Sequence, residues 1–404
     1  MKSVELFAGA GGLAMGVSLA GFESLAVVEW DKWACDTIRE NQRRGYPLVG
    51  DFPLWEGDVR DFDWRSIPEG IDLLAGGPPC QPFSMGGKHK AHGDKRDMFP
   101  PTVELVRQLK PKAFIIENVK GLTRTSFANY FQYILLQLEF PEVARKQGEA
   151  WLDHLRVLQE EKSTGALHAT GLTYNVIPTL VNAADYGIPQ KRERVFIVGF
   201  RADLGIEWSF PRPTHSFDAL LYSQWISGDY WDRHGVPASK RPNISGKLEN
   251  RIRRLSSALW PVEEKPWRTV RDALIDIPDP RDKSANEFLN HGFQDGAKPY
   301  KGHTGSPRDL PAKALKAGDH GVPGGENMMV LDDGGVRYFS VRESARIQTF
   351  PDGYAFHGSW TETMRQLGNA VPVALARQVA ASVAERLAEA GLRELTRSKG
   401  RSVA

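Results

Sequence analysis

Short apolar runs alternate with longer amphipathic segments along the N-terminal part of the chain. The apolar runs have the length of buried β-strands and fall at residues 3–7, 25–28, 71–75 and 113–116. The segments between them have the length and period of crossover helices, at residues 13–20, 32–41 and 102–109. This alternation predicts an α/β protein with an open, Rossmann-like and mostly parallel sheet.

The pattern changes further along the chain. Residues 127–162 have helical periodicity with a break at Pro141, and strand patterns return at residues 174–181 and 195–200. We assign no chemistry to the helical stretch, which reads as an elaboration between two strand regions.

Regular periodicity is then lost among proline, glycine, tryptophan and scattered charges as far as about Arg337. Helical patterns resume at residues 341–348 and 373–390. We therefore predict three parts: a first domain over residues 1–200, a second and irregular domain over residues 201–337, and a C-terminal segment, residues 338–404, that packs back on the first domain.

Composition and length place further limits on the protein. A chain of 404 residues with 41% hydrophobic and 25% charged residues is typical of a globular protein large enough for two domains. The two cysteines, Cys35 and Cys80, exclude a disulfide framework and a four-cysteine metal site, and we predict no metal. The N-terminus lacks the features of a signal peptide and no segment has the length of a membrane span, so the expected location is the cytoplasm. The formal net charge of +2 neither indicates nor excludes nucleic acid.

The run ELFAGAGG places Gly9, Gly11 and Gly12 between a strand and a helix. Glycines there let a ligand approach the backbone, which indicates a nucleotide-cofactor site, although a tight strand-to-helix turn has the same spacing. Glu29 ends the second strand at roughly the 20-residue offset at which such sheets bind ribose hydroxyls, and Asp58 ends the next strand region. A helix cap or a solvated turn is the alternative interpretation of either acid.

A proline-stiffened loop, GGPPCQPFS, follows a predicted strand and carries Cys80, and Glu117 directly follows the next strand in ENV. Both residues would therefore lie at the carboxyl edge of the sheet. A thiolate that adds to carbon 6 of cytosine turns carbon 5 into a nucleophile, and a carboxylic acid at N3 can neutralise the developing charge. The alternative for a free cysteine is a small buried hydrophobic residue, which we expect for Cys35.

The run QKRER brings Arg192 and Arg194 to the start of the strand at residues 195–200. A guanidinium there could bind the cytosine O2, orient the acid or bind a phosphate. A solvated charge cluster is the other interpretation, and the residues alone do not decide.

These motifs, together with GNAVP at residues 368–372, resemble in type and order those of the DNA cytosine-5 methyltransferase family of prokaryotic restriction–modification systems. The resemblance covers most of the chain. It implies the Rossmann-like sheet of S-adenosylmethionine-dependent methyltransferases with a smaller, irregular target-recognition domain. It also implies methyl transfer from S-adenosylmethionine to carbon 5 of a flipped-out cytosine in a specific duplex DNA sequence, through a covalent bond between Cys80 and carbon 6, with S-adenosylhomocysteine as the product.

The resemblance also implies residue roles. Phe7 would lie against the adenine, Glu29 on the ribose, Asp58 near the adenine amino group, and Trp30 beside Glu29. The complete cofactor set comprises Phe7, Ala8, Gly9, Gly11, Gly12, Leu13, Glu29, Trp30, Asp58, Val59, Pro79, Asn369, Ala370 and Val371. The catalytic set comprises Cys80 as nucleophile, Glu117 as the N3 partner, Arg194 as the O2 contact and Arg192 as a support.

DNA contacts are expected from two regions. Residues 86–96 match the family loop that closes over DNA, residues 342–352 resemble the motif that braces the second domain, and residues 201–337 would read the sequence. Arg251 and Arg254 have helical spacing, which also fits a solvated helix face, and the tryptophans of this region are expected in its core. The candidate DNA-binding residues are Ser84, Gly87, Lys88, Arg96, Lys240, Arg241, Arg251 and Arg254.

Two alternatives stay open on the sequence: a cytosine-5 methyltransferase that acts on RNA, and a non-catalytic DNA-binding relative. A methyltransferase of exocyclic amino groups is disfavoured, because such enzymes need Asp or Asn where this chain has PPCQ. The expected partner is double-stranded DNA, bound by a monomer, with a restriction endonuclease as the functional counterpart.

Overall fold

The computed structural model describes residues 1–79, 97–165, 171–258, 262–301, 303–318 and 327–401. Five predicted site residues, Cys80, Ser84, Gly87, Lys88 and Arg96, lie outside the described residues. Among the helices that are described, none combines the length and hydropathy needed to cross a membrane.

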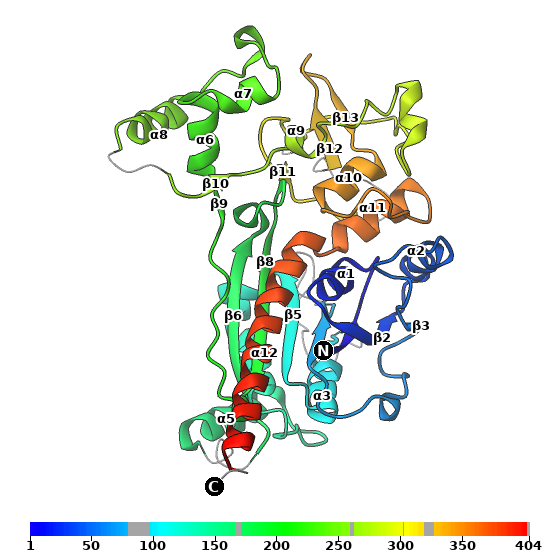
Figure 1. Ribbon diagram of the computed structural model, residues 1–404, viewed down its shortest axis with the longest axis vertical. Helices are drawn as coiled ribbons and strands as arrows, with labels where there is room; N and C mark the ends of the chain where they lie inside the picture. The colour runs from blue at the N-terminus through cyan, green and yellow to red at the C-terminus, as the bar shows by residue number, and fades with distance from the viewer. Residues whose placement is uncertain (80–96, 166–170, 259–261, 302, 319–326, 402–404) are drawn as a thin grey trace.

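A seven-stranded sheet forms the centre of the larger unit (Figure 1). Its order is β3-β2-β1-β4-β5-β8-β6, and only β8 runs antiparallel to its neighbours. The strands are β1 (Lys2–Leu6), β2 (Glu23–Glu29), β3 (Leu54–Glu56), β4 (Leu73–Gly76), β5 (Ala113–Val119), β6 (Tyr174–Asn182) and β8 (Glu193–Arg201). The prediction of an open, mostly parallel sheet is confirmed.

Helices cover both faces of this sheet because successive strand residues point to opposite sides. Val4 and Leu6 pack in the core beneath α3 and α4, whereas Leu73 and Ala75 pack in the core beneath α1 and α12. The helices of this unit are α1 (Gly12–Leu19), α2 (Lys32–Arg43), α3 (Phe99–Leu109), α4 (Ala128–Glu139), α5 (Trp151–Thr164) and α12 (Val373–Arg401). The predicted interruption at Pro141 is confirmed, since it lies between α4 and α5.

The C-terminal helix α12 packs against α1. A Cβ on Gly16 of α1 would lie 2.3 Å from the Cβ of Ala376 in α12, so the absence of a side chain lets the two helices touch. Cys35 is fully buried in α2, and burial raises the pKa of its thiol to about 12, which confirms that it is a core residue.

The second unit is irregular and lies above the carboxyl edge of the sheet (Figure 1). The chain first packs Ile206 and Trp208 into the core of the larger unit and leaves it after Phe210. The elements of this unit are β9 (His215–Ser216), α6 (Phe217–Trp225), α7 (Asp229–Arg233), α8 (Gly246–Ser256), β10 (Lys265–Pro266), α9 (Val270–Ala273), β11 (Ala312–Lys313), β12 (Met328–Val330) and β13 (Val336–Tyr338). Helices α10 (Val341–Ile347) and α11 (Trp360–Asn369) follow and share a core with the glycine loop of the larger unit.

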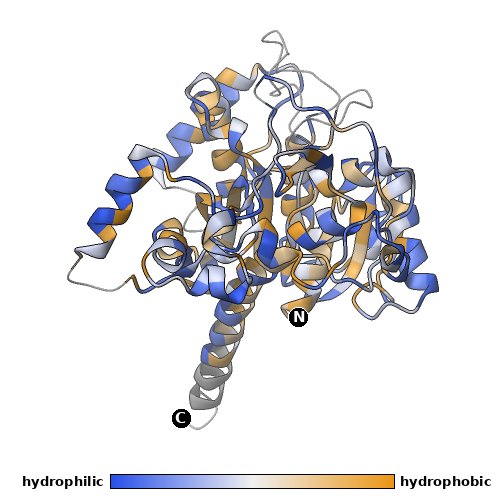
Figure 2. Ribbon diagram, turned by 90° about the horizontal axis from the view of Figure 1, so that it is seen from above, coloured by the Kyte–Doolittle hydropathy of each residue, from blue (hydrophilic) through white to orange (hydrophobic). Residues whose placement is uncertain are grey.

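Two small cores hold this unit together. One surrounds Trp231, which is fully buried with Trp225 packed against it, as predicted for tryptophans of this region. The other contains Leu315, Met329 and Phe339. Helix α8 stands at the side of the molecule, is largely hydrophilic and has no buried residue (Figure 2).

Candidate active site

The turn from β1 into α1 has a backbone that glycine makes accessible. Gly9 and Gly11 have φ angles of 55° and 87°, in the left-handed region. A Cβ on Gly12 would lie 2.4 Å from the carbonyl oxygen of Val371, so the segment GNAVP packs directly on this loop. Phe7 adopts φ 54° without being glycine, which is a strained conformation of the kind that gathers at ligand sites.

Glu29 ties this loop to the end of β2. Its buried carboxylate accepts hydrogen bonds from the backbone N–H groups of Gly9 (2.6 Å), Trp30 (2.9 Å) and Asp31 (2.7 Å). Burial raises the pKa of Glu29, and these donors oppose the rise. The indole of Trp30 is 68% exposed beside it, as a free aromatic face at the rim of the loop.

Asp58 lies next to this loop, because the N–H of Gly57 donates to the carbonyl of Glu29 at 2.9 Å. Its carboxylate accepts hydrogen bonds from the backbone N–H (2.9 Å) and Nε (2.8 Å) of Arg60, and this pairing lowers the pKa of Asp58. Sequence reasoning missed Arg60, although its place two residues after the acid is a local signal. Val59 is buried in the core.

The remaining predicted cofactor residues differ in how far they are buried. Ala8, Leu13, Ala370 and Val371 are buried, and Pro79 and Asn369 are exposed. The structure therefore gathers the glycine loop, the ends of β2 and β3 and the turn after α11 at one edge of the sheet.

Glu117 projects from β5 and is 7% exposed. Arg194 of the adjacent strand β8 places its Nε 2.8 Å from Glu117 Oε1 as an ion pair. The alignment is not that of a hydrogen bond, and this oxygen has no hydrogen-bond partner among the described residues. Burial raises the pKa of Glu117, while Arg194 and Arg192 oppose the rise. A buried carboxyl paired with a single arginine retains the capacity to bind a further polar group.

The start of the cysteine loop lies against this acid. A Cβ on Gly77 would be 3.4 Å from Glu117 Oε2, and Asn118 Nδ2 donates to the carbonyl of Pro78 at 2.9 Å. The chain that enters Cys80 is thus held beside Glu117, as expected for neighbouring strand ends.

The two arginines of QKRER have different surroundings. Arg192 is fully buried and donates to the carbonyls of Leu315 (3.1 Å), Gly368 (2.7 Å) and Ala370 (3.0 Å). Burial lowers its pKa well below the usual range. A solvated charge cluster and a phosphate contact are therefore both excluded for Arg192, which supports backbone around the site. Arg194 faces Glu117 with 14% of its side chain exposed.

The predicted DNA-binding arginines of the second unit are partly engaged within it. Arg251 pairs with Asp218 and lies 5.1 Å from the ring centre of Phe217. Arg241 lies 5.6 Å from the ring centre of Trp231. The other two predicted contacts, Lys240 and Arg254, are exposed.

Arg342, in the segment for which the resemblance implies a bracing role, joins parts of the chain by hydrogen bonds. It is fully buried, and its guanidinium donates to the carbonyls of Leu289 (2.9 Å), Pro351 (3.1 Å) and Tyr354 (2.6 Å). These bonds hold the irregular chain near residue 289 against the turn that follows α10.

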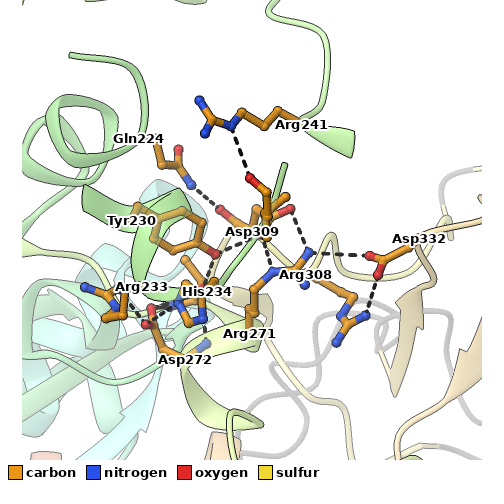
Figure 3. Close-up of polar contacts among 12 residues, drawn as sticks. Gln224, Tyr230, Arg233, His234, Arg241, Arg271, Asp272, Arg308, Asp309 and Asp332 are labelled. Carbon is orange, nitrogen blue, oxygen red and sulfur yellow. Dashed lines mark hydrogen bonds and ion pairs between the residues drawn. The ribbon is translucent and has the colours of Figure 1, made fainter. Parts of the chain in front are cut away.

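A polar network at the centre of the second unit was not predicted (Figure 3). The Tyr230 hydroxyl and Arg271 Nε both donate to Asp309 Oδ1, at 2.9 and 2.6 Å. Arg271 and Arg308 also pair with Asp332, at 3.4 and 2.9 Å. Burial lowers the pKa of Arg271, but the hydrogen bond to Asp309 and the negative charge of that residue outweigh it. The net effect is a raised pKa. No sequence spacing links these residues, which come from separate parts of the second unit.

The sheet order, the glycine loop and the buried acid after β2 define a fold of the S-adenosylmethionine-dependent methyltransferase type. The fold is similar to that of the S. pombe Dnmt2 methyltransferase, with a TM-score of 0.54 and 17% identity over 96% of this chain and 99% of that one. The family model of C-5 cytosine-specific DNA methylases matches residues 1–141 and 156–385. The chain therefore belongs to the C-5 cytosine-specific DNA methylase family and is a DNA cytosine-5 methyltransferase.

Curated relatives agree with this assignment. The chain is 32% identical over 394 residues to the type II methyltransferase M.PspPI of Psychrobacter sp. (strain TA137), covering 95% of this chain and 79% of the relative. It is 31% identical over 389 residues to the type II methyltransferase M.Sau96I of Staphylococcus aureus, covering 95% and 75%.

Proposed function

We propose that this enzyme methylates carbon 5 of a flipped-out cytosine in a specific duplex DNA sequence through a covalent bond between Cys80 and carbon 6. The observation that carries the proposal is the buried carboxyl of Glu117, which pairs with Arg194 and has the start of the cysteine loop beside it. A carboxyl held in this way can serve a ring nitrogen of a base that enters the site.

The proposed chemistry divides between these side chains. The Cys80 thiolate adds to carbon 6 and pushes electron density onto N3 and O2 of the ring. Glu117 donates a proton or a strong hydrogen bond to N3, and Arg194 stabilises charge at O2. Methyl transfer at carbon 5, loss of the carbon 5 proton and elimination of Cys80 then restore the aromatic ring.

S-adenosylmethionine fits the loop after β1. It supplies the methyl group as an electrophile when it is bound. Glu29 would hold the ribose, Phe7 and Trp30 the adenine, and Asp58 the adenine amino group, for which Asp58 must share its carboxylate with Arg60. The strained φ of Phe7 and the close packing of Gly12 on Val371 support a loop built around a ligand.

The biological role is proposed from the relatives, whose names describe type II methyltransferases. We propose a monomeric modification enzyme paired with a restriction endonuclease, in which residues 201–337 form the target-recognition domain. The Asp309 network would keep the DNA-reading surface rigid, and residues 338–404 would join it back to the catalytic domain.

Transfer of labelled methyl groups from S-adenosylmethionine to genomic duplex DNA and to total tRNA tests this function. We expect label in DNA, recovered after hydrolysis as 5-methylcytosine. Label in tRNA alone would favour the RNA alternative, and no label in either, with the cofactor bound, would favour a non-catalytic relative.

A further inference from the structure

A buried polar junction joins four segments that are far apart in the sequence. They are the start of the arginine motif at Gln190, the chain that leaves the second unit at Leu315, the end of α10 at Gln348, and the turn between α11 and α12 at Ala370. Gln190 and Gln348 are both fully buried. Buried side-chain amides are almost always hydrogen-bonded at both ends, and this pair follows that rule.

The amide of Gln190 connects two sides of the molecule. Its Oε1 accepts from the N–H of Leu315 at 3.0 Å, and its Nε2 donates to Gln348 Oε1 at 3.0 Å. Gln348 Nε2 in turn donates to the carbonyls of Leu367 and Ala370. A continuous chain of hydrogen bonds therefore runs from the second unit to the turn that packs on the cofactor loop.

Backbone packing makes the junction tight. A Cβ on Gly368 would lie 2.2 Å from the backbone nitrogen of Ala317, so the turn and the chain from the second unit are in direct contact. Strand β11 of that chain pairs with β7 (Gln190–Lys191), and Arg192 donates to carbonyls on both sides. Displacement of one segment therefore disturbs the other.

The backbone is also strained at this junction, at Thr349, the residue after Gln348. Its φ of 57° is unusual for a β-branched residue, and its Oγ1 accepts from the N–H of Ala374 at 2.9 Å. Such a conformation persists only where the surroundings hold it, which indicates that the geometry of this turn is specified and not incidental.

We infer that Gln190 is a positioning residue that couples closure of the cofactor pocket to the seating of the chain that leaves the second unit. The inference rests on the cofactor site of the proposed function. A cofactor held against the glycine loop orders the turn that packs on Gly12, and with it the Ala370 carbonyl. The relay of hydrogen bonds from Ala370 through Gln348 and Gln190 then orders the chain at Leu315. By linkage, correct seating of the second unit on DNA strengthens cofactor binding.

Hydrogen–deuterium exchange of the full chain with and without S-adenosylhomocysteine tests the inference. In the wild type we expect the ligand to protect residues 366–376 and also residues 312–317. In Gln190→Met we expect protection at 366–376 to persist and protection at 312–317 to be lost. The control is Gln224→Met, which removes a buried glutamine that donates to the Asp309 carbonyl at 2.8 Å, within the second unit and outside the junction; both protections should remain.

Gln348→Met breaks the same relay from the cofactor side and serves if Gln190→Met does not fold. Protection confined to 366–376 in the wild type, or unchanged protection at 312–317 in both relay variants, would overturn the inference alone. Failure of the wild type to bind S-adenosylhomocysteine in calorimetry would overturn the proposed cofactor site and the inference with it.

Discussion

Replacement of Glu117 by glutamine tests the chemistry of the site most sharply. The amide keeps the size of the carboxyl and can still lie beside Arg194, but it cannot deliver a proton to the cytosine ring. General acid catalysis contributes typically 10²- to 10⁴-fold, or about 2.7–5.4 kcal/mol of barrier. We therefore expect a loss of that size in the rate of methyl transfer, measured in a single turnover with saturating cofactor.

The pH dependence separates a proton donor from a structural acid. Burial raises the pKa of Glu117, so its protonated form becomes populated at higher pH than for an exposed glutamate. The wild-type rate should fall as the pH rises through that pKa, and Glu117→Gln should lack this limb. A matched control is Glu193→Gln, which removes the exposed partner of Lys120 on the neighbouring strand and should leave the profile unchanged. A folded Glu117→Gln enzyme within a few-fold of the wild type would refute the proton-donor role.

Three further results are expected. Cys80→Ser should abolish methylation yet bind S-adenosylhomocysteine normally in calorimetry, since a hydroxyl is a weak nucleophile; measurable turnover would count against the covalent route. Gly12→Ala places a Cβ 2.4 Å from the Val371 carbonyl oxygen, and overpacking of about 1–3 kcal/mol should weaken S-adenosylhomocysteine binding by roughly 5- to 150-fold, whereas Gly246→Ala, in open space, should not weaken it. Glu5 is fully buried with a pKa raised from 4.5 to about 7, so the stability it contributes is present below pH 4.5 and lost as the pH rises through 7. That loss is on the order of 3 kcal/mol in urea unfolding and should vanish in Glu5→Gln.

The regular elements could be predicted because their signals are local. The apolar run at residues 113–116 has the length and composition of a buried strand, and β5 begins at the predicted residue, Ala113. The edge strand β3 has only three residues, two of them half-buried, so its pattern is too short to define bounds. The glycine and acid motifs could likewise be predicted to meet at one edge of the sheet, because their order along the chain maps directly onto strand ends in a parallel sheet.

The partners of side chains that bind backbone groups far away in the sequence could not be predicted. The residues alone did not distinguish Arg192 from Arg194, although the resemblance implied a supporting role for Arg192. Which groups it supports, the carbonyls of residues 315, 368 and 370, is visible only in the fold. The hydrogen bonds of Gln190 and the network around Asp309 also join residues that are far apart in the sequence. No periodic pattern in the sequence predicts these contacts. The predicted DNA contacts at Ser84 and in the closing loop, residues 86–96, stay predictions.

Covalent trapping tests the central claim most directly. Bisulfite sequencing of DNA from cells that express the enzyme first identifies the methylated sequence, and a duplex with 5-fluorocytosine at that position is then incubated with enzyme and S-adenosylmethionine. Fluorine cannot leave carbon 5 as a proton does, so the account predicts a stable protein–DNA adduct whose mass includes one methyl group and whose attachment maps to Cys80. An unmodified duplex that is methylated under the same conditions while the fluorinated one forms no adduct would contradict it.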